Sequence, residues 1–167
     1  ASDLIDFVEN YTKEKGLSPV RYNIEIKSQD ANGEGKLWPT YDSFVRSCAL
    51  LLHSKHLGDR LVVQSFDVRA LEYMHERYPE FILSYLVNAK EPDFDKFMSK
   101  LKFTPEWLSP HHEITNEALV QKCREKGMKI VPWTVDNPED IKRMIDLKVD
   151  AIISNYPDRV LMQTRGY

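Results

Sequence analysis

The chain has 167 residues, of which 42% are hydrophobic and 29% are charged, and its net charge is −3. This length suits one domain that buries about two-thirds of its surface, and the composition argues against disorder, nucleic-acid binding and attraction to an anionic membrane. No apolar run approaches the ~20 residues of a membrane span, and the N-terminus lacks the basic start and apolar core of a secretion signal. The sequence therefore predicts a soluble globular chain.

Helices and strands are predicted to alternate along the chain after a first helix that ends at Gly16. The loop at 28–36 is long, polar and rich in Gly, Asp and Asn. The predicted helices include one capped by Asp67 and one opened by Thr115 and closed by Gly127. Six strands are predicted, at 22–27, 61–65, 81–87, 107–109, 129–134 and 151–153. Strands that are each followed by a helix favour a parallel sheet with right-handed crossovers.

Polar residues recur at the carboxyl ends of these strands, and this recurrence decides between two parallel architectures. Glu25 and Lys27, Gln64, Ser109 and Thr134 occupy such positions. A barrel gathers strand ends of this kind at its mouth. An open nucleotide-binding sheet loses its best support, because neither a G-x-G-x-x-G motif nor a P-loop is present. The pattern predicts an α/β fold of the TIM-barrel type.

Glu25 and Lys27 are the most informative pair, because they lie two residues apart on an otherwise apolar strand. Strand side chains alternate between faces, so both charged heads point the same way. A carboxylate facing a barrel interior can hold a divalent cation, and an amine there can meet an anionic phosphate oxygen. The alternative is a solvent-exposed Glu/Lys pair on an edge strand.

Other reactive side chains favour structural interpretations. Cys48 and Cys123 are isolated thiols in predicted helices, which fits packing better than a metal or redox site. His53 and His56 fall at the C-terminal turn of a helix, where histidine meets the helix dipole favourably. The run 111–113, His-His-Glu, follows the fourth strand and is predicted to be a loop whose neighbouring side chains point apart.

Four segments in series resemble the glycerophosphodiester phosphodiesterase family: 23–27 (NIEIK), 63–67 (VQSFD), 131–136 (VPWTVD) and 149–158 (VDAIISNYPD). This resemblance covers nearly the whole chain. It implies a (β/α)8 barrel that hydrolyses glycerophosphodiesters to glycerol 3-phosphate and an alcohol with the help of a divalent cation, Ca²⁺ or Mg²⁺. It also favours a periplasmic or secreted protein over a cytoplasmic one.

The resemblance also indicates what the chain lacks. The family opens with a His-Arg-Gly strand and continues with a strand that bears a Glu-x-Asp pair and a downstream His-Asp, and no predicted strand of this sequence carries any of these motifs. Residues 1–167 are therefore expected to be a partial TIM-barrel domain without the first two β/α units. The family's two acid/base histidines and two of its three metal carboxylates belong to that missing stretch. We expect an excised C-terminal portion of an ordinary enzyme.

The remaining site residues follow from the resemblance, position by position. Glu25 matches the family's third metal ligand, and Lys27 matches the lysine that meets the substrate phosphate. Trp133 matches the aromatic residue near the barrel mouth that contacts the glycerol or leaving group, although a tryptophan at a strand end is otherwise an ordinary core residue. Gln64 is expected to bond a substrate hydroxyl, and Phe66 is expected either to line the pocket or to pack within its loop.

Two further expectations concern departures from the family pattern. Asp136 stands where the family usually carries Asn, so an amide is replaced by a carboxylate that can only accept hydrogen bonds. The partial barrel would also leave sheet edges open. The alternative function is therefore a non-catalytic partial barrel that binds a partner or self-associates through those edges. For the enzyme, the expected partner is a small-molecule glycerophosphodiester substrate, with no nucleic acid and no membrane span.

Overall fold

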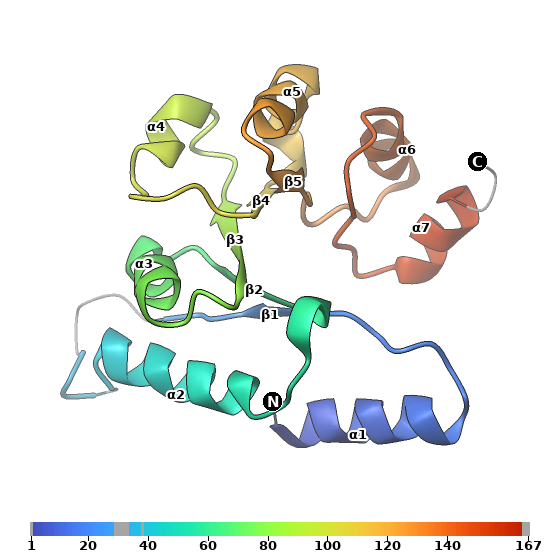
Figure 1. Cartoon of the computed structure of the whole chain (residues 1–167). Coiled ribbons are helices and arrows are strands. Elements are labelled where there is room, and N and C mark those ends of the chain that lie inside the picture. The colour runs from blue at the N-terminus through green and yellow to red at the C-terminus, as the bar shows by residue number, and fades with distance from the viewer. Residues whose placement is uncertain (1, 29–33, 38, 165–167) are drawn as a thin grey trace. The chain divides into compact units, whose positions relative to one another are not determined.

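The structure is a computed structural model that describes residues 2–28, 34–37 and 39–164. The chain divides into two compact units, 1–83 and 84–167, each of which is described by itself (Figure 1). The middle of the predicted polar loop, 29–33, lies outside the described residues. The first unit contains α1 (Ser2–Glu14), β1 (Tyr22–Glu25), α2 (Tyr41–His53), the 3₁₀ turn η1 (Gly58–Arg60), β2 (Leu61–Ser65) and α3 (Val68–Arg77).

The strand β3 (Ile82–Val87) begins in the first unit and ends in the second. The second unit continues with α4 (Phe94–Met98), β4 (Trp107–Pro110), the 3₁₀ turn η2 (His112–Ile114), α5 (Glu117–Glu125), β5 (Lys129–Ile130), α6 (Pro138–Asp146) and α7 (Pro157–Thr164). Helices therefore separate the strands along the chain, as an α/β fold requires.

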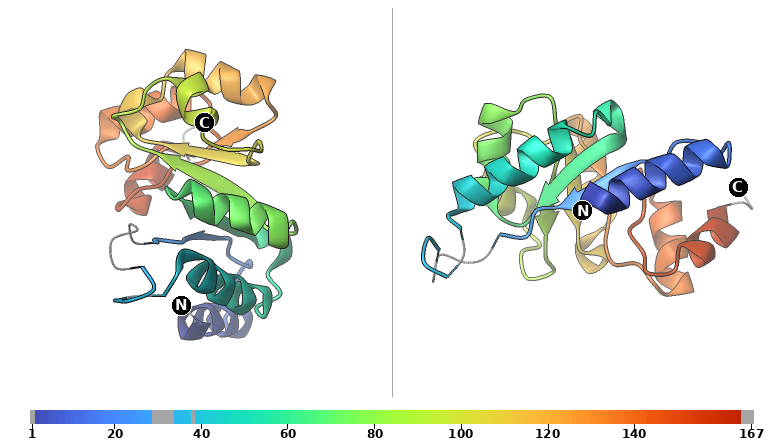
Figure 2. Two further views of the ribbon diagram at one scale, coloured as in Figure 1. Left: turned by 90° about the vertical axis from the view of Figure 1, so that its left-hand side faces the viewer. Right: turned by 90° about the horizontal axis from the view of Figure 1, so that it is seen from below.

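The first unit is built on the parallel pair β1 and β2, in which Tyr22 is opposite Leu61 and Glu25 is opposite Gln64. Helices α2 and α3 pack against each other beside these strands (Figures 1 and 2). All five residues of β2 are buried. A strand buried on both faces reads as a continuous apolar run, which is why Leu-Val-Val lacks the alternation of a half-exposed strand.

In the second unit β3, β4 and β5 form a parallel ladder, with Ser84 opposite Trp107 and Leu108 opposite Ile130. Helix α5 packs near β5, and α6 packs against α7. Val135, Ile141 and Met144 are fully buried and form a hydrophobic cluster around α6. Ile145, Leu147, Val149, Ile152 and Val160 pack against this cluster. Cys123 is also buried and its pKa is raised to about 12 by that burial, which confirms its packing role.

The helices begin where short polar side chains satisfy the first backbone N–H groups. Asp67 caps α3 by accepting from the N–H of Arg69, as predicted, and Asn137 caps α6 ahead of Pro138. The prediction that Thr115 opens the fifth helix is wrong. Asn116 is the cap and accepts from the N–H of Leu119 at 2.9 Å, while the Thr115 hydroxyl donates to the carbonyl of His111.

The predicted sixth strand is also wrong, since residues 151–153 do not form a β-strand. The chain there is still hydrogen-bonded to its neighbour: Val135 donates to Ile153, and Ile153 donates to Pro132. The fifth strand, Lys129–Ile130, is shorter than predicted, although Val131 and Trp133 still donate to the carbonyls of Leu108 and Pro110 beyond its end. Pro132 lies between these donors and has no N–H to offer to the segment 151–153 on the other side. Five strands alternate with helices in the described part of the chain.

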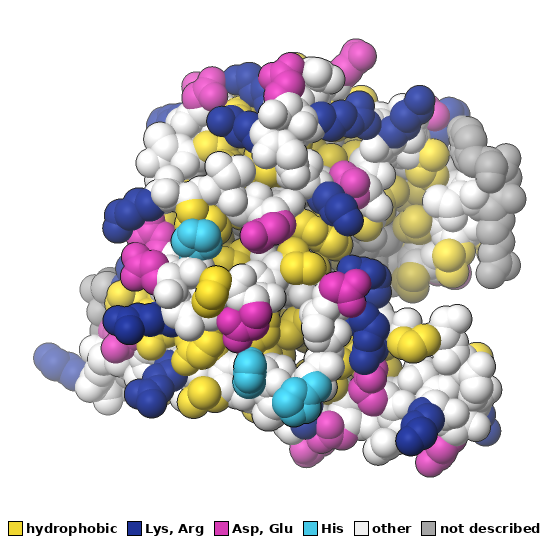
Figure 3. Space-filling view, in the orientation of Figure 1, with side chains coloured by type: hydrophobic (Ala, Val, Ile, Leu, Met, Phe, Trp, Pro, Cys, Tyr) yellow, Lys and Arg dark blue, Asp and Glu magenta, His cyan; other side chains and the backbone are white. Residues whose placement is uncertain are grey.

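The surface mixes charges of both signs. Figure 3 shows basic and acidic side chains interspersed, with hydrophobic side chains between them. Exposed ion pairs such as Lys122 with Asp95 at 2.8 Å are screened by solvent and add little, so the buried clusters carry the stability. Among the described residues, no helix is both long and apolar enough to cross a membrane.

Candidate active site

The charged heads of Glu25 and Lys27 lie together at the carboxyl end of β1. Lys27 Nζ is 3.7 Å from Glu25 Oε1. The Glu25 side chain is 29% exposed and that of Lys27 is 80% exposed. The intervening residue, Ile26, is buried on the other face. The strand alternation therefore presents an acid and an amine side by side on one face.

Gln64 and Phe66 lie beside this pair, at the end of the neighbouring strand. Gln64 is opposite Glu25 in the parallel register and is 9% exposed. Its side-chain oxygen accepts a hydrogen bond from Asn23 Nδ2 at 3.0 Å, so its amide orientation is fixed from within the unit. Phe66 follows β2 directly and is 41% exposed. The substrate-binding roles of both residues stay predictions.

A hydrogen-bond network joins the end of β1 to the turn after β2. The Ile26 N–H donates to the Gln64 carbonyl at 2.8 Å, and the Ser65 hydroxyl donates to the Ile26 carbonyl at 2.7 Å. The Ser28 hydroxyl then donates to Asp67 Oδ2 at 2.6 Å. The residues on both sides of Lys27 are thereby held to the second strand and its turn.

Asp67 is in turn fixed by Arg69, whose guanidinium donates to both carboxylate oxygens. Burial alone would raise the pKa of Asp67, but hydrogen bonds from Arg69 and Ser28 outweigh it and hold the pKa below its usual value. Arg69 also pairs with Glu34 at 3.2 Å and lies over the Tyr41 ring. The sequence predicted only a capping role for Asp67. The two-residue spacing between Asp67 and Arg69 is the feature of the sequence that could have predicted their ion pair.

Trp133 is held in the second unit at the carboxyl ends of β4 and β5. Its indole Nε1 donates to the Ser109 carbonyl at 2.7 Å, and its backbone N–H donates to the Pro110 carbonyl. The His111 ring meets the indole edge to face, with centroids 5.0 Å apart. Trp133 is partly exposed, so its ring combines a fixed position with an accessible surface.

The interpretation of 111–113 as a loop whose side chains point apart is wrong. Residues 112–114 form a 3₁₀ turn, and the His111 and His112 rings lie together with centroids 4.7 Å apart. Burial, followed by the neighbouring His112, lowers the pKa of His111. Arg143 donates to the His112 carbonyl at 3.0 Å and fixes the turn against α6. The tight turn brings the two rings together. The prediction assumed an extended chain, in which neighbouring side chains point in opposite directions, so it missed this contact.

Asp136 lies just before α6 and accepts hydrogen bonds from the turn that precedes α7. Its carboxylate accepts from the Ser154 hydroxyl at 3.0 Å, from the Asn155 backbone at 2.8 Å and from the Asn155 side chain at 2.9 Å. The bonds from Asn155 are the main reason that the pKa of Asp136 is lowered. The carboxylate that departs from the family pattern is therefore matched to donors in this chain.

A divalent cation needs more ligands than the described residues bring together. Calcium takes six to eight oxygen ligands, and magnesium takes six. Across the described ranges there is no group of three or more His, Cys, Asp or Glu side chains placed to hold a metal ion. Glu25 supplies one carboxylate and already has the Lys27 amine at 3.7 Å. The described residues do not form a complete cation site by themselves.

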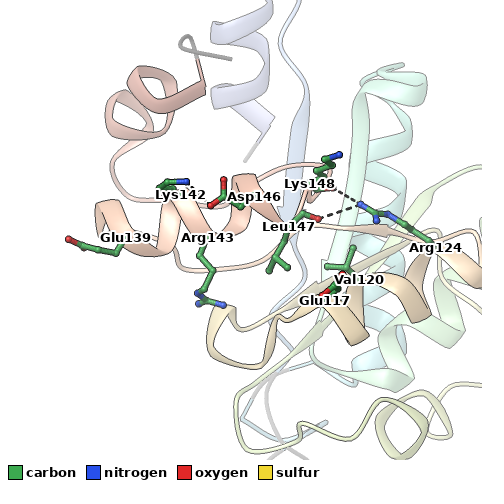
Figure 4. Close-up of a pocket in the computed structure, with 9 residues that line it drawn as sticks. All are labelled: Glu117, Val120, Arg124, Glu139, Lys142, Arg143, Asp146, Leu147 and Lys148. Atoms are coloured by element: carbon green, nitrogen blue, oxygen red, sulfur yellow. Dashed lines mark hydrogen bonds and ion pairs between the residues drawn. The ribbon is translucent and has the colours of Figure 1, made fainter.

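A cavity lies between α5 and α6 of the second unit (Figure 4). Its volume is about 660 Å³, and both acidic and basic side chains line it. Its charged groups have partners within the unit: Lys142 pairs with Asp146, and Arg124 donates to the carbonyls of Leu147 and Lys148. None of the residues that line it is one of the predicted site residues.

The sequence matches the model of the glycerophosphoryl diester phosphodiesterase family over residues 7–159. A glycerophosphodiester phosphodiesterase of Bacillus subtilis (strain 168) is 29% identical over 150 residues, which are 87% of this chain and 50% of the relative. A second, from Caldanaerobacter subterraneus subsp. tengcongensis, is 29% identical over 145 residues, covering 86% of this chain and 55% of the relative. The chain thus spans about half the length of the curated relatives it matches.

The fold is also similar to that of a solved phosphodiesterase from Oleispira antarctica in complex with the product sn-glycerol-3-phosphate. The TM-score is 0.72 at 19% identity, and the match covers 95% of this chain and 59% of the other. This structural likeness confirms the predicted α/β fold of TIM-barrel type, of which the chain forms an incomplete part.

Proposed function

Because the chain belongs to the glycerophosphoryl diester phosphodiesterase family, we propose that the full-length protein hydrolyses glycerophosphodiesters and that residues 1–167 carry part of its active site. Water would cleave the phosphodiester to glycerol 3-phosphate and an alcohol. The observation that carries this proposal is the pairing of Glu25 and Lys27 heads at one strand end, 3.7 Å apart, within the segment that matches the family.

Lys27 is proposed to bind the substrate phosphate and stabilise the negative charge that develops on its oxygens. An ammonium group can approach two phosphate oxygens and lower the barrier by favouring the transition state over the ground state. The high exposure of the Lys27 side chain leaves it accessible to a ligand. The support is positional, because the amine stands at a carboxyl strand end, where barrel enzymes place their catalytic groups.

Glu25 is proposed to contribute one carboxylate to a divalent cation whose other ligands lie outside the described residues. Such a cation, Ca²⁺ or Mg²⁺, would act as a Lewis acid toward phosphate oxygens. Gln64, Phe66 and Trp133 are proposed to contact the glycerol and alcohol parts of the substrate. No residue of this chain is assigned the proton transfer to the leaving alkoxide.

The test is release of glycerol 3-phosphate from glycerophosphocholine by the full-length gene product, whatever its extent beyond residues 1–167. Replacing Lys27→Met should lower kcat about 100-fold or more, the usual loss when one donor to a developing oxyanion is removed. Glu25→Gln should lower activity and shift its dependence on added cation to higher concentration. Residues 1–167 alone should hydrolyse this substrate poorly or not at all.

A matched control is Lys13→Met, which removes a lysine from the last turn of α1. It should leave kcat and KM unchanged. Full activity in the Lys27→Met variant would contradict the assigned role of Lys27, and absence of phosphodiesterase activity in the full-length protein would contradict the function itself.

A further inference from the structure

We propose that Ser28 and Asp67 are positioning residues for Lys27, holding its backbone so that the amine reaches the substrate phosphate. This inference rests on the proposed function and extends it to residues that do not contact the substrate. The two side chains come from different segments, since Ser28 follows β1 and Asp67 follows β2. They meet at 2.6 Å, Ser28 Oγ to Asp67 Oδ2.

The need for such a device follows from the exposure of Lys27. Its side chain is 80% exposed, and its contact with Glu25, at 3.7 Å, is too long for a strong hydrogen bond. A long, solvated side chain has many rotamers, and restricting them costs conformational entropy. Precise placement of the amine must therefore begin with a fixed backbone.

The backbone on both sides of Lys27 is anchored. Before it, Ile26 donates its N–H to the Gln64 carbonyl and accepts from the Ser65 hydroxyl. After it, Ser28 bonds to Asp67. Ser65 also accepts from the Asp67 N–H at 3.1 Å, so one turn of chain serves both anchors. The residues on both sides of Lys27, Ile26 and Ser28, are therefore each held by hydrogen bonds to β2 or to the turn after it.

Asp67, the acceptor of the Ser28 bond, is itself held by further hydrogen bonds. Asp67 caps α3 through Arg69 N at 3.0 Å, and the Arg69 guanidinium bonds both carboxylate oxygens. Charge-assisted bonds of this type are stronger than neutral ones. Arg69 continues to Glu34, which accepts from the Tyr41 N–H at 2.6 Å at the start of α2. The network therefore ties the end of β1 to the starts of two helices.

A purely structural role for Asp67 is the alternative, since every helix cap adds stability. Ser28→Ala separates the two interpretations, because it removes the bond next to Lys27 and leaves the cap and the Arg69 pair intact. Asp93→Ala is the matched control. Asp93 caps α4 by accepting from the N–H groups of Asp95 and Lys96, and it has no bond to β1 among the described residues.

The experiment is a double-mutant cycle on glycerol 3-phosphate affinity, measured by calorimetry on the full-length gene product. Ser28→Ala and Asp67→Ala should each weaken binding about tenfold, equivalent to ~1.4 kcal/mol, when Lys27 is present. Both effects should shrink to less than about twofold in the Lys27→Met background. Asp93→Ala should leave affinity unchanged in both backgrounds.

Amide hydrogen exchange provides a readout that does not depend on ligand binding. The amide to follow is the Ile26 N–H, next to Lys27, which donates to the Gln64 carbonyl. Its exchange should accelerate in Ser28→Ala and Asp67→Ala but not in Asp93→Ala. Unchanged exchange at Ile26, or losses of affinity that persist in the Lys27→Met background, would overturn the inference. Faster exchange at Ile26 in a protein that binds no glycerol 3-phosphate would uphold the anchor and reject the proposed function.

Discussion

Glu9 is the most heavily bonded carboxylate on α1. Arg60 donates to its two oxygens at 2.8 and 2.6 Å, and the Tyr22 hydroxyl donates at 2.8 Å. These bonds join α1, β1 and the turn before β2. Hydrogen bonds from Arg60 and then Tyr22 lower the pKa of Glu9 to about 2. The carboxylate must therefore be ionised for the clamp to hold.

This clamp predicts an acid-dependent stability. The pKa of Glu9 is lower in the folded chain than its ordinary value of 4.5, so its contribution is fully present above pH 4.5 and is lost as pH falls toward 2. Urea unfolding at pH 7, 4.5 and 3 should show a smaller loss of stability in Glu9→Gln than in the wild type. Equal pH slopes would contradict this prediction. Glu14→Gln, on the same helix, is the control.

Ser84 and Ser109 form a buried pair between β3 and β4, with hydroxyl oxygens 2.8 Å apart. Both residues are fully buried. Either single change to alanine leaves one hydroxyl without this partner and should cost about 1–3 kcal/mol of unfolding free energy. The double variant should cost less than the sum of the two, because it removes both polar groups. A strictly additive cycle, measured by urea unfolding, would show that the bond contributes nothing.

At the scale of the element, α5 tests how a helix start is chosen. Asn116 accepts from the Leu119 N–H, so Asn116→Ala should destabilise the protein by about 1 kcal/mol, whereas Asn116→Asp should keep most of the cap. Thermal or urea unfolding measures both. If Asn116→Ala were neutral and Asn116→Asp destabilising, the cap would not be the source of this helix boundary.

Local chemistry explains which elements the sequence could predict. Asp67 and Asn137 cap helices that were predicted near them, because the cap depends on side chain and backbone a few residues apart. Thr115 and Asn116 are both acceptable caps, and what separates them is a bond from Thr115 to the His111 carbonyl, which the sequence pattern did not reveal. Residues 151–153 have the apolar run of a strand, but a β-strand also needs a regular series of backbone hydrogen bonds to a neighbouring strand, and these residues do not form one.

The same distinction applies to the candidate site. The side-by-side heads of Glu25 and Lys27 follow from strand alternation alone. The bond between Ser28 and Asp67 joins residues 39 positions apart, so it depends on how β1 and β2 are registered. The neighbouring, tilted rings of His111 and His112 depend on a 3₁₀ turn that the residue pattern did not reveal. Local alternation was predictable, and contacts across elements were not.

At the scale of the whole molecule, β1 forms one edge of the sheet in the described strands. In the described strands, β1 is hydrogen-bonded to β2 alone. The Ile26 N–H points toward β2, where it meets the Gln64 carbonyl. Because neighbouring N–H groups of a strand point in opposite directions, those of Asn23 and Glu25 face the other edge. An edge with free donors and acceptors is a template for pairing with another strand.

We therefore expect residues 1–167 to self-associate through β1 when they are produced alone. Sedimentation equilibrium should give an average mass that rises with protein concentration. Asn23→Pro should lower that rise, because proline removes a donor from the outer edge and spares the N–H groups that face β2. Ile24→Pro is the contrasting variant, since it removes a donor that faces β2 and should unfold the pair. A constant monomer mass in the wild type, with a cooperative melt, would rule out pairing through this edge.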